Sequence, residues 1–230
     1  MRPIGFSTGA LAKGDVAWAL ELLRPSGTRT VELSALRLHE VEPLCRLAPT
    51  LDLSAYDYVS VHAPSRYGAA EEPRVARAMM ELAGRGWQIV LHPDTLHEFE
   101  PWRELGSRLV IENMDKRKPI GRTVAELGRI FERLPEARFC FDLGHARQVD
   151  RTMTEAYLLA REFGHRLCQL HVSEVTTQSR HDRLSWGSVQ AFQRVARWIP
   201  AHVPVVLETP VSAEELAEQC RLIEVALPVA

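Results

Sequence analysis

The chain has 230 residues, of which 46% are hydrophobic and 25% are charged, so its composition is ordinary for a globular protein. Its formal net charge of -2 argues against the strongly basic surface typical of nucleic-acid-binding proteins. No apolar run approaches the roughly 18 residues that a membrane helix needs, and Met1 is not followed by a signal-peptide pattern. The four cysteines form no C-x-x-C pair, so we expect a reduced, cytoplasmic protein.

Eight short apolar runs follow one another along the chain, and each is closed by a turn. Most are rich in Val, Ile, Leu and Phe, as expected of strands that are buried on both faces. Their starts lie roughly 20 to 37 residues apart, which leaves room for a crossover helix after each strand. The runs cover residues 4–9, 29–34, 58–64, 88–93, 109–114, 139–144, 167–173 and 204–210.

Helical patterns fill most of the intervals between these runs. Residues 15–24 carry apolar side chains at helical spacing behind a leading Asp15. Three further helices are predicted to begin with the capping-box pattern Ser/Thr-x-x-Glu, at Thr123, Thr152 and Ser212. The helix expected within residues 96–106 is the weakest, because Pro101 interrupts it.

Eight alternating strand and helix units predict the fold class α/β, with a single (β/α)8 TIM barrel that spans residues 1–230. The structural alternative is an open, doubly wound sheet. No run is followed by G-x-G-x-x-G, so the sequence offers no support for a dinucleotide site.

Seven of the eight predicted strands place an ionisable side chain near their carboxyl end, and only the first, which ends at Ser7 and Thr8, does not. In a barrel these ends converge at one mouth, where active sites lie. Side chains two positions earlier point the same way and are uncharged, which favours a packed layer beneath the mouth. The seven end residues are Glu32, His62, His92, Glu112, Asp142, His171 and Glu208.

A bound metal is the simplest explanation for this clustering of charge. A single histidine after a strand is more often a hydrogen-bonded structural residue than a ligand. Four carboxylates and three imidazoles at one mouth, however, repel and desolvate one another unless cations neutralise them. His145, just beyond the sixth strand, adds a fourth imidazole. Mixed histidine and carboxylate ligands fit Zn, Mn, Fe or Co, as one or two ions, with Glu112 as a possible bridge.

The motifs at these strand ends resemble the xylose-isomerase-like TIM-barrel superfamily, which includes endonuclease IV and sugar isomerases and epimerases. The segments "VHAP", "IVLHP", "LVIEN", "FCFDLGHA", "LHVSE" and "VVLETP" are similar, in order, to metal-bearing strand ends of endonuclease IV. The resemblance implies one metal held by Glu112, Asp142, His171 and Glu208, as in the isomerases. The endonuclease branch adds imidazoles, which fall on His62, His92 and His145.

The seventh strand departs from the endonuclease pattern, which continues with Asp-x-His and a Gly-x-Gly turn. Here the stretch is "SRHDRLSWGSV", in which His181 and Asp182 stand in another order and only one glycine follows. A third metal site is therefore not expected. The short chain also leaves little room for loops that grip DNA, so DNA is possible as a partner but is not favoured.

Basic residues are frequent in the loops after the strands, which favours a small anionic or carbohydrate substrate. A solvated loop is the plainer interpretation of a run such as "MDKRKP" at residues 114–119. The candidate substrate-binding residues are Arg66, Lys116, His181, Arg183 and Glu32.

Two enzymatic interpretations remain open at this point, with Glu112 and Glu208 as the candidate catalytic residues in both. In the favoured one, two ions support hydrolysis of a phosphoester, because the histidines exceed what a single ion needs. In the other, one ion chelates a hydroxycarbonyl while the two glutamates move a proton. A third interpretation is a barrel that binds metal or sugar without turnover. The sequence leaves the metal, the substrate and the oligomeric state open.

Overall fold

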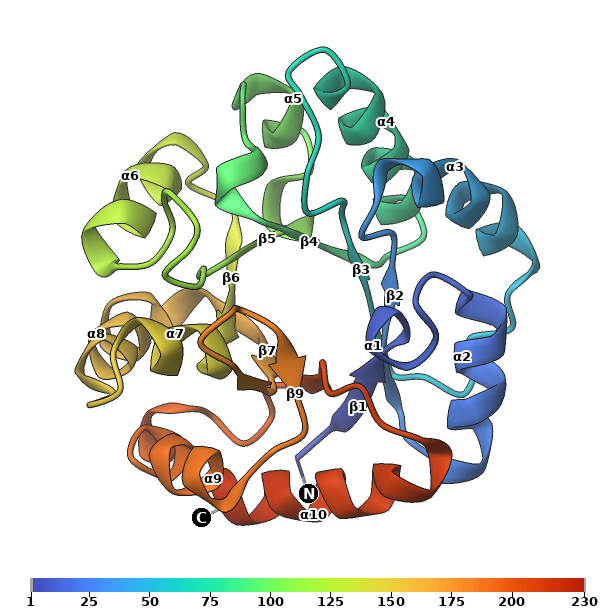
Figure 1. Ribbon diagram of the computed structural model, residues 1–230. Helices are drawn as coiled ribbons and strands as arrows, with labels where there is room; N and C mark the ends of the chain where they lie inside the picture. Colours follow the sequence, from blue (N-terminus) through green and yellow to red (C-terminus); the bar gives the residue numbers. More distant parts are fainter. Residues whose placement is uncertain (1, 230) are drawn as a thin grey trace.

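Eight parallel strands close into a barrel in the computed structural model, which describes residues 2–229. Figure 1 shows the helices as an outer ring around the strands. The barrel order is β1-β10-β7-β6-β5-β4-β3-β2. The bounds are β1 Ile4–Ser7, β2 Thr30–Ser34, β3 Tyr58–His62, β4 Gln88–Leu91, β5 Leu109–Glu112, β6 Arg138–Asp142, β7 Leu167–Val172 and β10 Val205–Leu207. The predicted (β/α)8 barrel is therefore confirmed, and the open sheet is excluded.

The outer helices differ greatly in length. Their bounds are α1 Thr8–Ala12, α2 Val16–Leu23, α3 Leu38–Leu47, α4 Glu72–Ala83, α5 Glu100–Arg103, α6 Val124–Arg133, α7 Leu143–Val149, α8 Thr154–Phe163, α9 Trp186–Gln193 and α10 Leu216–Ala226. Short 3-10 turns cover Arg24–Ser26, Ala48–Thr50, Pro93–Thr95, Gly106–Arg108, Gly164–Arg166, Ala196–Trp198 and Ala213–Glu215. Within residues 2–229, none of the helices has the length and apolar character needed to span a bilayer. An antiparallel pair, β8 Glu174–Val175 and β9 His181–Asp182, follows β7.

The predicted helix starts are largely as expected. Asp15 caps α2 by accepting a hydrogen bond from the backbone N–H of Trp18, and Thr123 caps α6. Ser212 forms a complete capping box with Glu215, which opens the 3-10 turn that leads into α10. These contacts satisfy backbone donors that a helix start otherwise leaves free.

The capping box predicted at Thr152 is wrong, because a nearby carboxylate takes the same donors. Asp150 accepts from the backbone N–H groups of Thr152 and Glu155 and from the Thr152 hydroxyl. Helix α8 then begins at Thr154, one residue later than the box would place it, after Met153 in the left-handed region. The Glu155 carboxylate instead accepts from Val124 at the start of α6.

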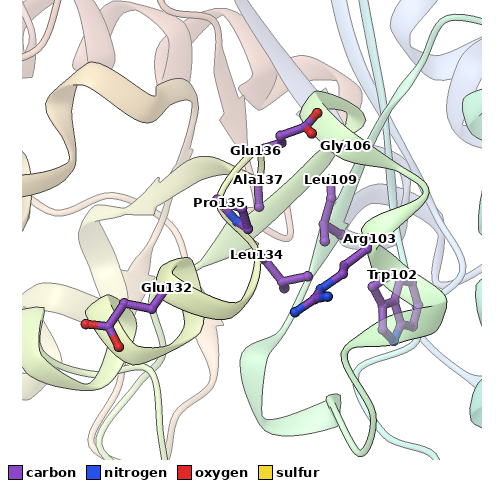
Figure 2. A pocket seen from close by; sticks show the side chains of 9 residues that line it. All are labelled: Trp102, Arg103, Gly106, Leu109, Glu132, Leu134, Pro135, Glu136 and Ala137. Atoms are coloured by element: carbon purple, nitrogen blue, oxygen red, sulfur yellow. The ribbon is translucent and has the colours of Figure 1, made fainter.

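The segment that the sequence marks as the weakest helix forms only the four residues of α5, with Pro101 in its first turn. A cavity of about 260 Å³ lies beside it, next to the start of β5 and the segment that leads into β6. Figure 2 shows Trp102, Leu109 and Leu134 among the side chains that line it. This cavity lies at the amino-terminal end of the barrel. Residues at that end usually serve the stability of the fold rather than catalysis.

Two apolar clusters hold the fold together, one between strands and helices and one inside the barrel. The inner cluster consists of Val90, Val110 and Cys140, with Cys168 packed against it. Residues paired in register point to the same side of a sheet. Val206 is paired with His171, and the Ser60 hydroxyl donates to Glu32. The inward direction predicted for this layer of side chains is thus confirmed.

Gly5 on β1 is a position where the fold leaves no room for a side chain. An added Cβ would lie 1.7 Å from the carbonyl oxygen of Thr30 on the neighbouring strand. We expect Gly5→Ala to lower the free energy of unfolding by at least about 2 kcal/mol, because backbone must move. Gly128→Ala in α6 is the control, since nothing lies within 4 Å of its added Cβ. Urea unfolding measures both, and a Gly5→Ala protein as stable as the wild type contradicts the expectation.

Candidate metal centre

The carboxyl ends of the strands surround a cavity of about 410 Å³. Most predicted ligands stand at the last residue of a strand or within one residue of it, so side-chain alternation aims them inward, whereas His145 lies in α7. Five predicted ligands line the cavity, and the loops after β1, β2, β3, β5, β7 and β10 contribute most of the remaining wall. The lining ligands are His62, His92, Glu112, His145 and Glu208.

Four side chains from adjacent strands form the first ligand group, which we call the tetrad. Its members Glu112, Asp142, His171 and Glu208 each offer an atom within 4.8 Å of the others. They come from β5, β6, β7 and the residue after β10. Three carboxylates and one imidazole in this arrangement match the donors of a divalent metal site.

A second group shares one residue with the tetrad. His62, His92 and Glu112 also lie within 4.8 Å of one another. The Oε2 atom of Glu112 is 3.3 Å from Nε2 of His62 and 3.3 Å from Nε2 of His92. The other oxygen, Oε1, lies 3.2 Å from Nδ1 of His171. The two carboxylate oxygens of Glu112 therefore face different groups.

A backbone carbonyl orients one of the two imidazoles of the second group. Nδ1 of His62 lies 2.7 Å from the carbonyl oxygen of Ala63, so this nitrogen carries the proton and Nε2 is free to bind. Nδ1 of His92 has no hydrogen-bond partner, and the nearest carboxylate oxygen, Oδ1 of Asp94, lies 4.0 Å away. A carboxylate or carbonyl behind a histidine is the usual way proteins fix the ring of a metal ligand.

Asn113 joins the two strands that carry Glu112 and Asp142. Its side chain donates to the carbonyl oxygen of Asp142 at 2.9 Å and accepts from the Asp142 N–H at 2.8 Å. Asp142 also caps α7, because its Oδ1 accepts from the His145 N–H at 2.6 Å. The second oxygen, Oδ2, remains directed to the tetrad without a hydrogen-bond partner. Sequence reasoning missed Asn113, although its position directly after Glu112 was a signal.

His145 and His181 lie beside the two groups but belong to neither of them. Nδ1 of His145 is 3.0 Å from the carbonyl oxygen of Asn113, and Nδ1 of His181 is 2.8 Å from the hydroxyl of Ser173. Their rings lie 5.5 Å apart. In the part of the chain that the structure describes, the remaining ligand group consists of His62, His171 and Glu208, which all belong to the first two groups.

Several buried polar atoms at the centre lack a hydrogen-bond partner, and this is the strongest sign that a cation belongs there. An orphaned buried polar group costs roughly 1–3 kcal/mol, and more when charged. The orphans of the two groups are both oxygens of Glu112, Oδ2 of Asp142, Nδ1 of His171 and Nδ1 of His92. All of these atoms except Nδ1 of His92 belong to residues of the tetrad, so the residues fit a bound metal.

The pKa values describe the same excess of negative charge. Burial would raise the pKa of Glu112, but His171, His145 and His62 hold it well below its usual range. Burial opposes the charged form of His145, yet Asp142 and Glu112 raise the pKa of its imidazole to about 10. Burial lowers the pKa of His92 to about 4, so this ring is neutral and ready to bind. A metal must therefore displace protons from some of these imidazoles.

The structure separates most of the predicted substrate-binding residues from this cavity. Of that set, only His181 lines it. Lys116 and Arg183 line a neighbouring cavity of about 450 Å³ beside α7 and the β8–β9 pair, and Arg183 pairs with Glu215. Arg66 is exposed on the loop after β3.

Glu32 requires the clearest correction. Its side chain is fully buried below the mouth, one layer under His62, because β2 pairs Glu32 with Ser60 rather than with His62. The expectation that Glu32 faces a substrate is therefore corrected.

Two lysines that the sequence did not single out as substrate-binding residues line the cavity instead. Lys13 is exposed at the end of α1, and Lys118 projects from the loop after β5. The Lys118 ammonium donates to Oδ2 of Asp94 at 2.7 Å and keeps 24% of its side chain exposed. Lys116 and Lys118 are close in sequence, and only the path of the loop decides which one reaches the metal ligands.

Comparison with known proteins supports the fold. No protein-family model and no curated protein matches this chain. A xylose isomerase domain protein from Alicyclobacillus acidocaldarius subsp. acidocaldarius matches at 16% identity and a TM-score of 0.64, covering 98% of this chain and 99% of that one. A xylose isomerase-like TIM barrel protein from Mycobacterium smegmatis, solved with magnesium, matches at 15% identity and a TM-score of 0.59, covering 99% and 98%.

A sugar-modifying enzyme has the same architecture. The 3-keto-D-glucoside 4-epimerase YcjR from E. coli matches at 14% identity and a TM-score of 0.55, covering 98% of this chain and 99% of its own. At such identities the likeness shows the fold. The resemblance to xylose-isomerase-like barrels predicted from the strand-end motifs is therefore confirmed at the level of the fold.

Proposed function

We propose that this protein is a metal-dependent enzyme with two ions, which hydrolyses a phosphoester in a small anionic sugar-like or nucleotide-like substrate. The observation that carries the proposal is the division of the two Glu112 oxygens between the tetrad and the pair His62 and His92. A single ion held by the four residues of the tetrad would not use His62 or His92. Two ions held near a phosphoester provide a nucleophilic hydroxide and neutralise the leaving oxygen.

The metal preference follows from the donors. The tetrad offers three carboxylates and one imidazole, which suits Mn or Fe, whereas two imidazoles and one carboxylate suit Zn, Fe or Co. The orphaned atoms of Glu112, Asp142 and His171 are the ones that such ions would satisfy.

Glu208 is the candidate for proton transfer. Its carboxylate is the most accessible of the tetrad, with 12% of the side chain exposed, and burial raises its pKa. Oε1 lies 3.6 Å from Nδ1 of His171, while Oε2 lies 3.5 Å from Nδ1 of His181 on the cavity wall. Glu208 is thus placed to take a proton from an attacking group or to return one to a leaving oxygen.

The size and charge of the cavity define the substrate class. A volume of about 410 Å³ is within the range of small-molecule sites and far below what a DNA duplex needs. Lys13 and Lys118 come from loops after β1 and β5, and ammonium groups at such positions favour a phosphate or carboxylate.

A mononuclear sugar isomerase or epimerase is the second candidate, because the tetrad is complete without the second group. In that case Glu112 and Glu208 would exchange a proton with the substrate carbon. The epimerase YcjR, which has the same fold, makes this chemistry a reasonable comparison. A barrel that binds without turnover is the remaining alternative.

A direct test starts from metal-free protein reconstituted separately with Zn²⁺, Mn²⁺ and Co²⁺. Bound metal is counted, and each form is assayed with small phosphate esters, abasic-site DNA and a panel of ketoses and aldoses. Phosphate release by a protein that holds two ions supports the proposal. Exchange of solvent protons into a ketose without phosphate release would favour the isomerase over the hydrolase. Cleavage of abasic DNA would contradict the assignment of a small substrate.

Lys118→Met provides a residue-level test of the anionic substrate. Loss of a charged hydrogen-bond donor costs roughly 1.5–3 kcal/mol, so we expect KM to rise about 10- to 100-fold with metal content unchanged. Lys116→Met is the matched control, because it removes the same charge two residues away from a side chain outside the cavity. If Lys116→Met raises KM more than Lys118→Met does, Lys116 is the substrate-binding lysine, as the sequence predicts.

A further inference from the structure

Glu32 is a buried carboxylate in the middle of the barrel. Its side chain has no exposed surface, and its Oε2 receives three contacts. The Ser60 hydroxyl donates at 2.9 Å, the Gln169 amide donates at 2.7 Å, and Nε2 of His171 lies at 3.0 Å. Among residues 2–229, no lysine or arginine pairs with Glu32. A charge buried at such a cost requires an explanation beyond packing.

The surrounding network orients this carboxylate toward His171. The Tyr58 hydroxyl donates to Oε1 of Gln169 at 2.7 Å, which turns the amide nitrogen of Gln169 to Glu32. The network joins strands β2, β3 and β7 directly beneath the tetrad. Ser60, Gln169 and Tyr58 therefore hold Oε2 in place, so the position of the carboxylate does not depend on the metal.

His171 stands between Glu32 below and the tetrad carboxylates above. Its Nδ1 lies 3.2 Å from Glu112 and 3.6 Å from Glu208, and it is buried without a hydrogen-bond partner. We infer that Glu32 is a positioning residue for His171: it accepts the Nε2–H and thereby directs the Nδ1 lone pair into the tetrad. This inference rests on the metal centre of the proposed function and assigns a task to a residue outside both ligand groups.

The opposite tautomer is the competing arrangement. The amide nitrogen of Gln169 also lies 2.7 Å from Nε2 of His171, so it would donate to that ring nitrogen. The Nε2 lone pair would then face the Glu32 carboxylate at 3.0 Å, and the proton on Nδ1 would block the tetrad. In the first tautomer the Nε2–H and the Gln169 amide are two donors 2.7 Å apart, but the anionic oxygen that accepts from both offsets their repulsion. In the second tautomer the Nε2 lone pair and that anion face each other as two acceptors. The first tautomer is therefore favoured.

Metal affinity tests the inference without an activity assay. Glu32→Gln is compared with the wild type by titrating metal-free protein with Co²⁺ against a competing chelator. Loss of a carboxylate behind a metal-binding histidine typically weakens binding 10- to 100-fold. We expect a loss of about that size for the tetrad ion, together with a changed visible spectrum of bound Co²⁺.

Glu72→Gln is the matched control, because Glu72 is equally buried and accepts hydrogen bonds from His97, Glu98 and Trp102 away from the metal centre. It should destabilise the fold without changing Co²⁺ affinity or the spectrum. Equal losses in both variants, or an unchanged affinity in Glu32→Gln, would overturn the inference while leaving the metal centre intact. A wild-type protein that binds no Co²⁺ would instead overturn the proposed function.

The tautomer can also be read in the wild type, which keeps the inference testable if Glu32→Gln does not fold. Long-range ¹H–¹⁵N spectra of the zinc-loaded protein report which nitrogen of His171 carries the proton. The signals of His171 are identified by their loss in His171→Asn. A proton on Nε2 with a metal-shifted Nδ1 supports the inference, and a proton on Nδ1 overturns it.

Discussion

Glu112→Gln is expected to remove metal from both ligand groups at once. Each group uses a different oxygen of the Glu112 carboxylate, and an amide provides only one neutral oxygen donor. Loss of residues that merely support a ligand already weakens binding 10- to 100-fold, so loss of the shared ligand should exceed about 100-fold at each site. Elemental analysis after dialysis against a weak chelator measures the remaining occupancy.

The control for this substitution must remove a buried carboxylate without touching the centre. Glu72→Gln meets this requirement, because Glu72 lies on α4 and is as fully buried as Glu112. If Glu112→Gln retains one tightly bound ion, then Glu112 is not a bridge and the two groups do not share it.

His92→Ala is expected to separate the two enzymatic interpretations. His92 belongs only to the second group, so the tetrad keeps all four of its ligands. We expect bound metal to fall from two ions per chain to one, and phosphoester hydrolysis to fall by at least about 100-fold, the upper range for loss of a supporting residue. Proton exchange with a ketose, which needs only one ion, would survive the same substitution.

His97→Ala is the matched control, since it removes an exposed imidazole five residues further along the same loop. It should leave both metal content and turnover near the wild-type values. A His92→Ala protein that still binds two ions and hydrolyses phosphoesters would remove the second group from the mechanism.

The barrel and its metal-type ligands were accessible from the sequence because they depend on local periodicity. Strands buried on both faces read as apolar runs, and an ionisable residue at the end of such a run stands at the mouth of any parallel barrel. Seven strand-end residues could therefore be named before their distances were known, and the family resemblance implied that Glu112, Asp142, His171 and Glu208 form one ligand set. The structure brings these four together within 4.8 Å.

The sequence alone did not determine which layer or which loop face a residue occupies. Glu32 resembles the other strand-end residues in sequence, but the register of β2 against β3 sets it one layer lower, beside Ser60. Lys116 and Lys118 have the same side chain, yet the path of the loop after β5 places only Lys118 on the cavity wall. Register and loop direction depend on contacts between residues far apart in the chain, and these are decided only when the barrel closes.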